Sequence, residues 1–132
     1  MCPSNTGHSS LQFNKETINA NTIRSYQPGC IRIGELSFSG HIIVAANTIL
    51  DNWDAGTPAA LSEASLAAAL ELQPEILIVG TGSAQTLPDT LLMAQLARRG
   101  VGLEIMTTAA ACRTYNVLAH EQRAVVAALF NA

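Results

Sequence analysis

Residues 74–108 read PEILIVGTGSAQTLPDTLLMAQLARRGVGLEIMTT, and this stretch decides the fold class. Its run Ile76–Val79 is apolar and mostly β-branched, which is typical of a strand buried on both faces of a sheet. Pro88 suits the first turn of a helix, and Gly100 suits the position just after its end. A second strand should follow over Val101–Met106. The stretch therefore predicts a βαβ unit whose two strands are parallel.

Two helices are expected around the second strand. The helix inside the βαβ unit should turn Leu91, Leu92 and Leu96 toward the sheet. A last helix should run through Ala109–His120, capped by one of the two threonines that precede it. The final segment, Arg123–Phe130, has helical content but suits a core strand equally well, and its periodicity does not decide between them.

Much of the chain before residue 74 has a sequence pattern typical of β-strands. Across residues 11–51, short apolar runs are separated by turn residues, and Gly34-Glu35 looks like a tight hairpin turn. This pattern predicts an N-terminal β-meander. A helix should follow, with Ser62 as its N-cap and an end before Pro74, because the residue before a proline disfavours helical geometry.

The length of the chain bounds the number of domains. A chain of 132 residues fits one domain. Residues 1–10 are rich in Ser, Pro, Gly and Asn, so a flexible tail is predicted there. Residues 11–132 should form a single α/β domain, with the meander first and a βαβ-α-β segment at its C-terminal end.

Composition and charge exclude several classes of function. The net charge is −3 with a single lysine, Lys15, so nucleic-acid binding is not expected. The longest uncharged apolar stretch, near Ala124–Phe130, is far shorter than the roughly 20 residues of a membrane span. No secretory or transit signal is visible at the start, and Cys2, Cys30 and Cys112 are expected to be reduced thiols. These features predict a cytoplasmic protein.

The shortage of charge suggests a covered surface. Only 13% of the residues are charged, against about 25% in typical domains. Part of the surface is then expected to meet a partner, which can be a second copy of the chain in a homodimer. The alternative is a small alanine-rich domain whose surface carries Ser, Thr and Asn instead of charges.

Two polar turns are the candidate binding crevice. Gly80, Thr81 and Gly82 follow the first strand of the βαβ unit, and Thr107 and Thr108 follow the second. The carboxyl ends of neighbouring parallel strands meet at one edge, which is where ligands bind in such sheets. Free N–H groups at the following helix start favour an anion or a carbonyl oxygen. The alternative is that these are ordinary turns and an N-cap.

The last helix carries two further candidates. Arg113 and Asn116 are polar residues three positions apart on an otherwise apolar helix, so they share a face. In one interpretation they line the crevice. In the other, Arg113 pairs with a carboxylate such as Glu104 or Glu121.

Catalytic chemistry has weak support. Cys112 lies close to a helix start, where the pKa of a thiol is lowered, so it is a weak candidate nucleophile; it also suits a small buried position. His8, His41 and His120 lack the spacing of metal ligands. The sequence contains no P-loop, GxGxxG or GxSxG motif. Neither a metal nor a cofactor is expected.

Four segments resemble one family. Residues 74–82 resemble its PE-apolar-GTG block, residues 102–108 its G-apolar-E-apolar-MTT block, and residues 111–118 and 121–129 its third and fourth blocks. The family is that of mitochondrial NADH–ubiquinone oxidoreductase (complex I) assembly factor 3 and its bacterial and archaeal relatives. Its eukaryotic members resemble assembly chaperones, and the resemblance implies no established reaction.

The resemblance also implies a fold. The family has a three-layer α/β domain whose central sheet is mixed, with the last strand antiparallel to its neighbours. Arg123–Phe130 would then be a core strand, entered by a turn in which many members have glycine. This chain has Gln122 at that position, so a strained turn is less expected here.

Three hypotheses of function follow. The first is a non-catalytic binding or complex-assembly module that holds a protein partner or a small anionic ligand at the Gly80 and Thr107 turns. The second is a small enzyme for an anionic or carbonyl-bearing metabolite, with Cys112 or Glu104 as the reactive group. The third is a structural subunit of an oligomer. The lack of a visible triad, metal cluster or carboxylate pair favours the first.

Overall fold

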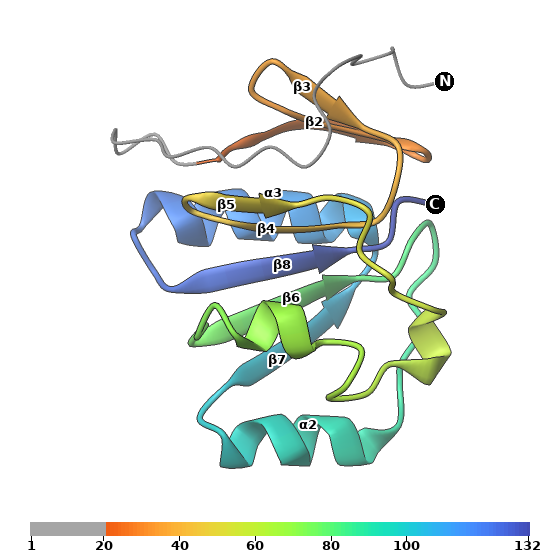
Figure 1. Ribbon diagram of the computed structural model, residues 1–132, viewed down its shortest axis with the longest axis vertical. Helices are drawn as coiled ribbons and strands as arrows, with labels where there is room; N and C mark the ends of the chain where they lie inside the picture. The colour runs from red at the N-terminus through yellow and green to blue at the C-terminus, as the bar shows by residue number, and fades with distance from the viewer. Residues whose placement is uncertain (1–20) are drawn as a thin grey trace.

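The computed structural model describes residues 21–132 (Figure 1). The tail predicted over residues 1–10 lies outside the described residues, as does the start of the predicted meander. The strands are β1 (Ile23–Gln27), β2 (Cys30–Ile33), β3 (Leu36–Phe38), β4 (Ile42–Ala45), β5 (Thr48–Leu50), β6 (Ile76–Gly80), β7 (Gly102–Met106) and β8 (Val125–Leu129). The helices are the 3-10 helix η1 (Pro58–Ala60), α1 (Ala67–Leu70), α2 (Thr90–Arg98) and α3 (Thr108–His120).

The predicted meander is divided between two sheets. Strands β1, β2 and β3 form an antiparallel three-stranded sheet, and its β2–β3 turn contains Gly34 in the left-handed region with φ 58°. Strands β4 and β5 leave it and join a five-stranded sheet of order β5-β4-β8-β6-β7. The physical reason lies in β4, because Ile42, Ile43 and Val44 are all fully buried and need a sheet that is covered on both faces.

The βαβ prediction is confirmed. Strands β6 and β7 are parallel neighbours, in a register that pairs Ile76 with Gly102 and Gly80 with Met106. The final segment is strand β8, which lies between β4 and β6. The expectation that it is antiparallel to its neighbours is wrong for β6, to which it runs parallel. Helix α3 carries the chain back to the starting edge of β6, so β8 runs in the same direction as β6 and only β4 opposes it.

The layers follow from the alternation of side chains along β8. Val125, Ala127 and Leu129 face a core shared with α3 and the three-stranded sheet. Val126 and Ala128 face a second core shared with α1 and α2. Figure 1 shows the three-stranded sheet at one end of the molecule and α2 at the other, with the five-stranded sheet between them. The predicted layered α/β domain with a mixed central sheet is confirmed.

The expectation that Leu91, Leu92 and Leu96 of α2 all face the sheet is wrong for Leu91. Leu92 and Leu96 are buried as predicted, but Leu91 is 63% exposed. Successive residues of a helix point about 100° apart, so the face that Leu92 and Leu96 define leaves Leu91 outside. Asp89 is the N-cap and accepts a hydrogen bond from the Leu91 backbone N–H at 2.9 Å. Gly100 follows the helix with φ 80°, as predicted for a C-terminal glycine.

Turns set the start of α1 and the start of β8. The helix expected from Ser62 is shorter, since α1 starts only at Ala67 and the Ser62 hydroxyl closes a turn by accepting from the Ser65 N–H at 3.2 Å. Before β8, Gln122 adopts φ 61°, so the left-handed turn forms without glycine. The Arg123 N–H donates to the Leu118 carbonyl at 3.1 Å across this turn.

Candidate functional site

The structure brings the two predicted turns together. The Thr81 N–H donates to the Met106 carbonyl at 2.8 Å, and the Thr108 N–H donates to the Gly82 carbonyl at 2.9 Å. The Gly82 N–H in turn donates to the Thr108 Oγ1 at 2.8 Å. The carboxyl ends of β6 and β7 therefore meet at one edge of the sheet, linked directly by backbone and hydroxyl groups.

The inner part of this junction is closely packed. A Cβ on Gly80 would lie 2.8 Å from the Thr108 Cα, so glycine is needed for helix α3 to approach the strand. Thr108 is fully buried, and its hydroxyl donates to the Phe130 carbonyl at 2.7 Å. The Phe130 N–H donates to the Gly80 carbonyl at 2.8 Å. The junction thus joins β6, α3 and the residue after β8.

The outer part of the junction supports a surface loop. The buried Thr81 hydroxyl donates to the Ala84 carbonyl at 2.7 Å and accepts from the Thr86 N–H at 3.1 Å. The Gln85 side-chain amide donates to the Ile105 carbonyl at 3.0 Å. These bonds hold the loop over residues 83–87 against the carboxyl ends of both strands.

The predicted N-cap of α3 is Thr107. Its side-chain oxygen accepts from the Ala110 N–H at 3.3 Å, so one of the free N–H groups at the helix start is satisfied within the chain. Thr107 is half-buried, in contrast to Thr108. Of the two threonines, Thr107 is therefore the one that a partner can reach.

The other two candidates on α3 have separate surroundings. The Asn116 side chain accepts from the Ile23 N–H at 2.9 Å and donates to the Ile23 carbonyl at 2.8 Å, which fastens β1 to the helix. It lies about two helical turns beyond Thr108. Arg113 is exposed and forms no ion pair with residues 21–132, so the pairing with Glu104 or Glu121 does not occur there.

The environment of Cys112 keeps its thiol protonated at neutral pH. Burial raises the pKa of this thiol to about 12, and the nearby Arg113 guanidinium lowers it only in part. A nucleophilic thiol needs a pKa near or below the working pH. Cys112 is a free cysteine, whereas Cys30 is disulfide-bonded. The expectation of reduced thiols is therefore wrong for Cys30, and cysteine usage gives no support to a reducing compartment.

Sequence reasoning missed an exposed apolar segment beside the turns. Leu87 is 67% exposed, Leu91 63% and Met93 49%. Leu87 is the last residue of the loop that Thr81 holds, and Leu91 and Met93 lie at the start of α2. The helical positions were visible in the sequence, because residues that flank the Leu92–Leu96 face point away from it.

Neither a metal-binding cluster nor a membrane-spanning helix occurs in the described part of the chain. Within residues 21–132, no group of three or more His, Cys, Asp or Glu side chains is arranged to hold a metal ion. No helix over the same residues combines the length and the apolar character needed to cross a membrane.

Comparison with known proteins relates the whole domain to others. The family described as "Protein of unknown function (DUF498/DUF598)" matches residues 23–130. NADH dehydrogenase (ubiquinone) 1 alpha subcomplex assembly factor 3 of Danio rerio is 32% identical over 117 residues, covering 87% of this chain and 67% of that protein. The 13 kDa major membrane protein of Francisella tularensis is 32% identical over 96 residues, covering 72% of this chain and 76% of that protein.

A solved structure has the same fold. The crystal structure of a Bordetella parapertussis protein superposes with a TM-score of 0.80 at 38% identity, over 89% of this chain and 100% of that one. The described arrangement is therefore that of a known fold.

Proposed function

This chain belongs to the family described as proteins of unknown function (DUF498/DUF598), and from that premise we propose that it is a protein-binding module that assists the assembly of a protein complex. Its relatives include a protein that is named as an assembly factor and matches 87% of this chain. We propose that the partner is a subunit of an NADH dehydrogenase, the complex in that relative's name. The partner would bind at the edge of the sheet where the Gly80 and Thr107 turns meet.

The exposed apolar side chains beside those turns carry the proposal. Leu87 and Leu91 are both more than half exposed, at 67% and 63%. Leu87 lies in the loop before α2, and Leu91 lies in the first turn of α2. Contiguous exposed apolar side chains bordered by polar residues are a common feature of protein interfaces. Burial of both leucines against a partner would stabilise the complex.

The turns support this surface by holding it in place. The Thr81 hydroxyl bonds to the loop at Ala84 and Thr86, and Gln85 bonds to the end of β7. A loop that is ordered before binding loses less conformational entropy when a partner arrives. In this proposal the glycines and Thr108 build the edge, while the exposed loop and the half-buried Thr107 meet the partner.

The proposal is tested by complementation in the organism that encodes this chain. Deletion of the gene should lower the amount of assembled NADH dehydrogenase on native gels. The wild type and a Val117→Ser control should restore it, because Val117 is 58% exposed but lies on α3, on the opposite face of the sheet. The Leu87→Ser/Leu91→Ser variant should accumulate normally and fail to restore it.

Two outcomes would count against the proposal. Unchanged complex levels after deletion would remove NADH dehydrogenase as the target. Full rescue by the double leucine variant would remove this surface. Sedimentation of the purified chain tests whether a second copy of the chain covers the leucines instead. In that case the wild type would be a homodimer and the double leucine variant a monomer. Cell fractionation tests the expected cytoplasmic location.

A further inference from the structure

A groove of about 560 Å³ lies between α1, the β4–β5 hairpin and the segment around Trp53. Three large apolar residues line it: Leu50 is half-buried, whereas Ile43 and Trp53 lie almost fully buried beneath the surface. The small side chains of Ala64, before α1, and of Ala67, in α1, also line the groove. None of these residues belongs to the exposed loop and leucines of the proposed assembly surface.

The charges around the groove have one sign. Asp51, Asp54 and Glu71 line it, and none of the described residues that line it is Lys, Arg or His. Asp54 and Glu71 are exposed and take part in neither of the ion pairs formed within residues 21–132. The groove thus combines apolar lining residues with two carboxylates, those of Asp54 and Glu71, that take part in no ion pair within residues 21–132.

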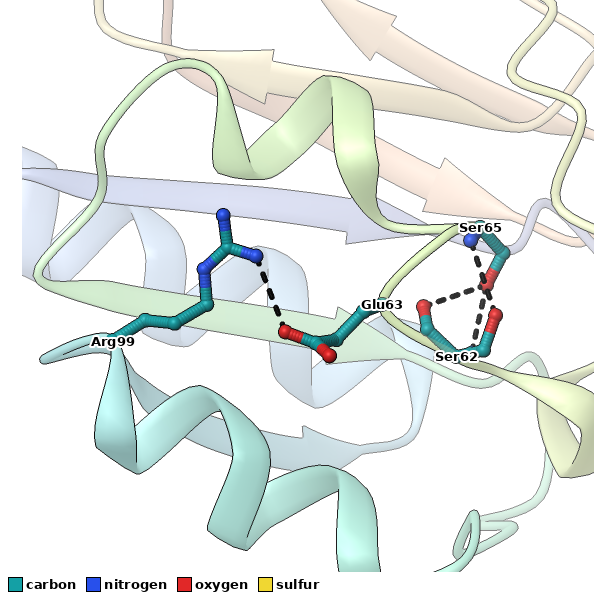
Figure 2. Close-up of polar contacts among 4 residues, drawn as sticks. All are labelled: Ser62, Glu63, Ser65 and Arg99. Carbon is teal, nitrogen blue, oxygen red and sulfur yellow. Dashed lines mark hydrogen bonds and ion pairs between the residues drawn. The ribbon is translucent and has the colours of Figure 1, made fainter.

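A neighbouring carboxylate provides a contrast. Glu63 precedes α1 but does not line the groove, and it pairs with the Arg99 guanidinium at 3.1 Å (Figure 2). Arg99 follows α2, so this ion pair joins the two helical segments on that face. Glu63 is therefore paired within the chain, whereas Asp54 and Glu71 take part in no ion pair within residues 21–132.

The wall of the groove is ordered by its own hydrogen bonds. Ser62 and Ser65 bond reciprocally, since each hydroxyl accepts from the other residue's backbone N–H, at 2.9 and 3.2 Å (Figure 2). The Trp53 Nε1–H donates to the Ser65 carbonyl at 2.9 Å. These bonds fix the indole ring against the wall, so the groove exists before anything binds.

We propose that this groove docks a segment of a partner protein in which Lys or Arg side chains alternate with aliphatic ones. The aliphatic side chains pack on Leu50, Ala67 and the exposed edge of Trp53, and the cations pair with Asp54 and Glu71. An acidic segment meets only carboxylates and is repelled. The inference does not depend on the proposed assembly function, because the two surfaces share no residue.

Trp53 is the single tryptophan of the chain, so its fluorescence reports binding in the groove. The purified full chain is titrated with a short peptide of alternating Leu and Lys, and the emission of Trp53 is recorded. The expected result is a saturable change with the Leu/Lys peptide, weakened by added salt because the rim pairs are exposed. Peptides of alternating Leu/Glu and of alternating Ser/Lys are expected to produce no saturable change.

Variants connect the binding to the two carboxylates. Asp54→Asn/Glu71→Gln should weaken binding about five-fold or more, the combined effect of two exposed ion pairs. Ala67→Lys should weaken it similarly, since it places a cation at the exposed wall. Glu35→Gln, an exposed acid in the β2–β3 turn, is the matched control and should bind as the wild type does.

The proposal is overturned by any of three results: no saturable change with the Leu/Lys peptide, equal affinity for the Leu/Glu or Ser/Lys peptide, or unchanged affinity of the double variant. Circular dichroism of each variant establishes that it is folded before its affinity is interpreted.

Discussion

Gly80 and Thr108 are packed so closely that a Cβ on the glycine would lie 2.8 Å from the Thr108 Cα and 2.9 Å from its Oγ1. The contact joins the end of β6 to the first residue of α3. It explains why a glycine stands at this position, since any side chain would push the helix away from the sheet.

Gly80→Ala should therefore destabilise the protein by about 1–3 kcal/mol, the usual cost of overpacking a core. Chemical denaturation measures the free energy of unfolding. Gly102→Ala is the control, because a Cβ there would meet the Glu75 carbonyl only at an ordinary 3.7 Å. Equal effects of the two substitutions would show that the close approach is not the cause.

Thr108→Val should lower the stability of the protein, whereas Tyr115→Phe should not. The Thr108 hydroxyl accepts from the Gly82 N–H and donates to the Phe130 carbonyl. Valine leaves both backbone groups without this hydrogen bond, so it should lower the free energy of unfolding by about 2–4 kcal/mol. The Tyr115 hydroxyl is buried without a hydrogen-bond partner among residues 21–132, so phenylalanine should leave stability unchanged or raise it by about 1 kcal/mol. A large loss in Tyr115→Phe would reveal a partner for that hydroxyl.

Gln122→Gly should raise the free energy of unfolding by about 1 kcal/mol, because a non-glycine residue in the left-handed region is strained. Gln122 has φ 61° at the end of α3, and Gly100 holds the equivalent place after α2 with φ 80°. Gly100→Ala should accordingly lower stability by a similar amount. Thermal unfolding of the two variants compares them, and a destabilised Gln122→Gly would contradict the expectation.

Stability should fall in alkaline solution. Burial raises the pKa of Cys112 from an ordinary value of 9.0 to about 12, so the unfolded chain releases this proton first. The stabilisation is complete below about pH 9 and is lost as the pH rises toward 12. Cys112→Ala should reduce the loss, measured as unfolding free energy against pH. Burial also raises the pKa of Tyr115, which should leave part of the loss in place.

The same raised pKa predicts slow alkylation of Cys112 in the native protein at neutral pH. The reaction should proceed at the rate of an ordinary thiol only after unfolding in denaturant. Time courses with iodoacetamide under both conditions compare the two rates. Fast labelling of the native chain would revive Cys112 as a candidate nucleophile.

The sequence by itself determined the local elements of the C-terminal half. Each of these elements is marked by a signal a few residues away or within it: an apolar run for each strand, Gly100 just after α2 and Thr107 just before α3. Strands β6 and β7 and helices α2 and α3 could therefore be predicted from the sequence. It also indicated that the turns after β6 and β7 share an edge, because parallel strands of a βαβ unit end on the same side.

Only the tertiary structure decided what those elements meet. Strand β8 pairs with β4 and β6, and β4 leaves the meander because a strand buried on both faces needs the central sheet. Asn116 bonds to Ile23, 93 positions away, and Thr108 bonds to Phe130, 22 positions away. Such contacts depend on three-dimensional neighbours that local periodicity does not encode. For the same reason the groove beside Trp53 emerged only once the helices and sheets were packed together.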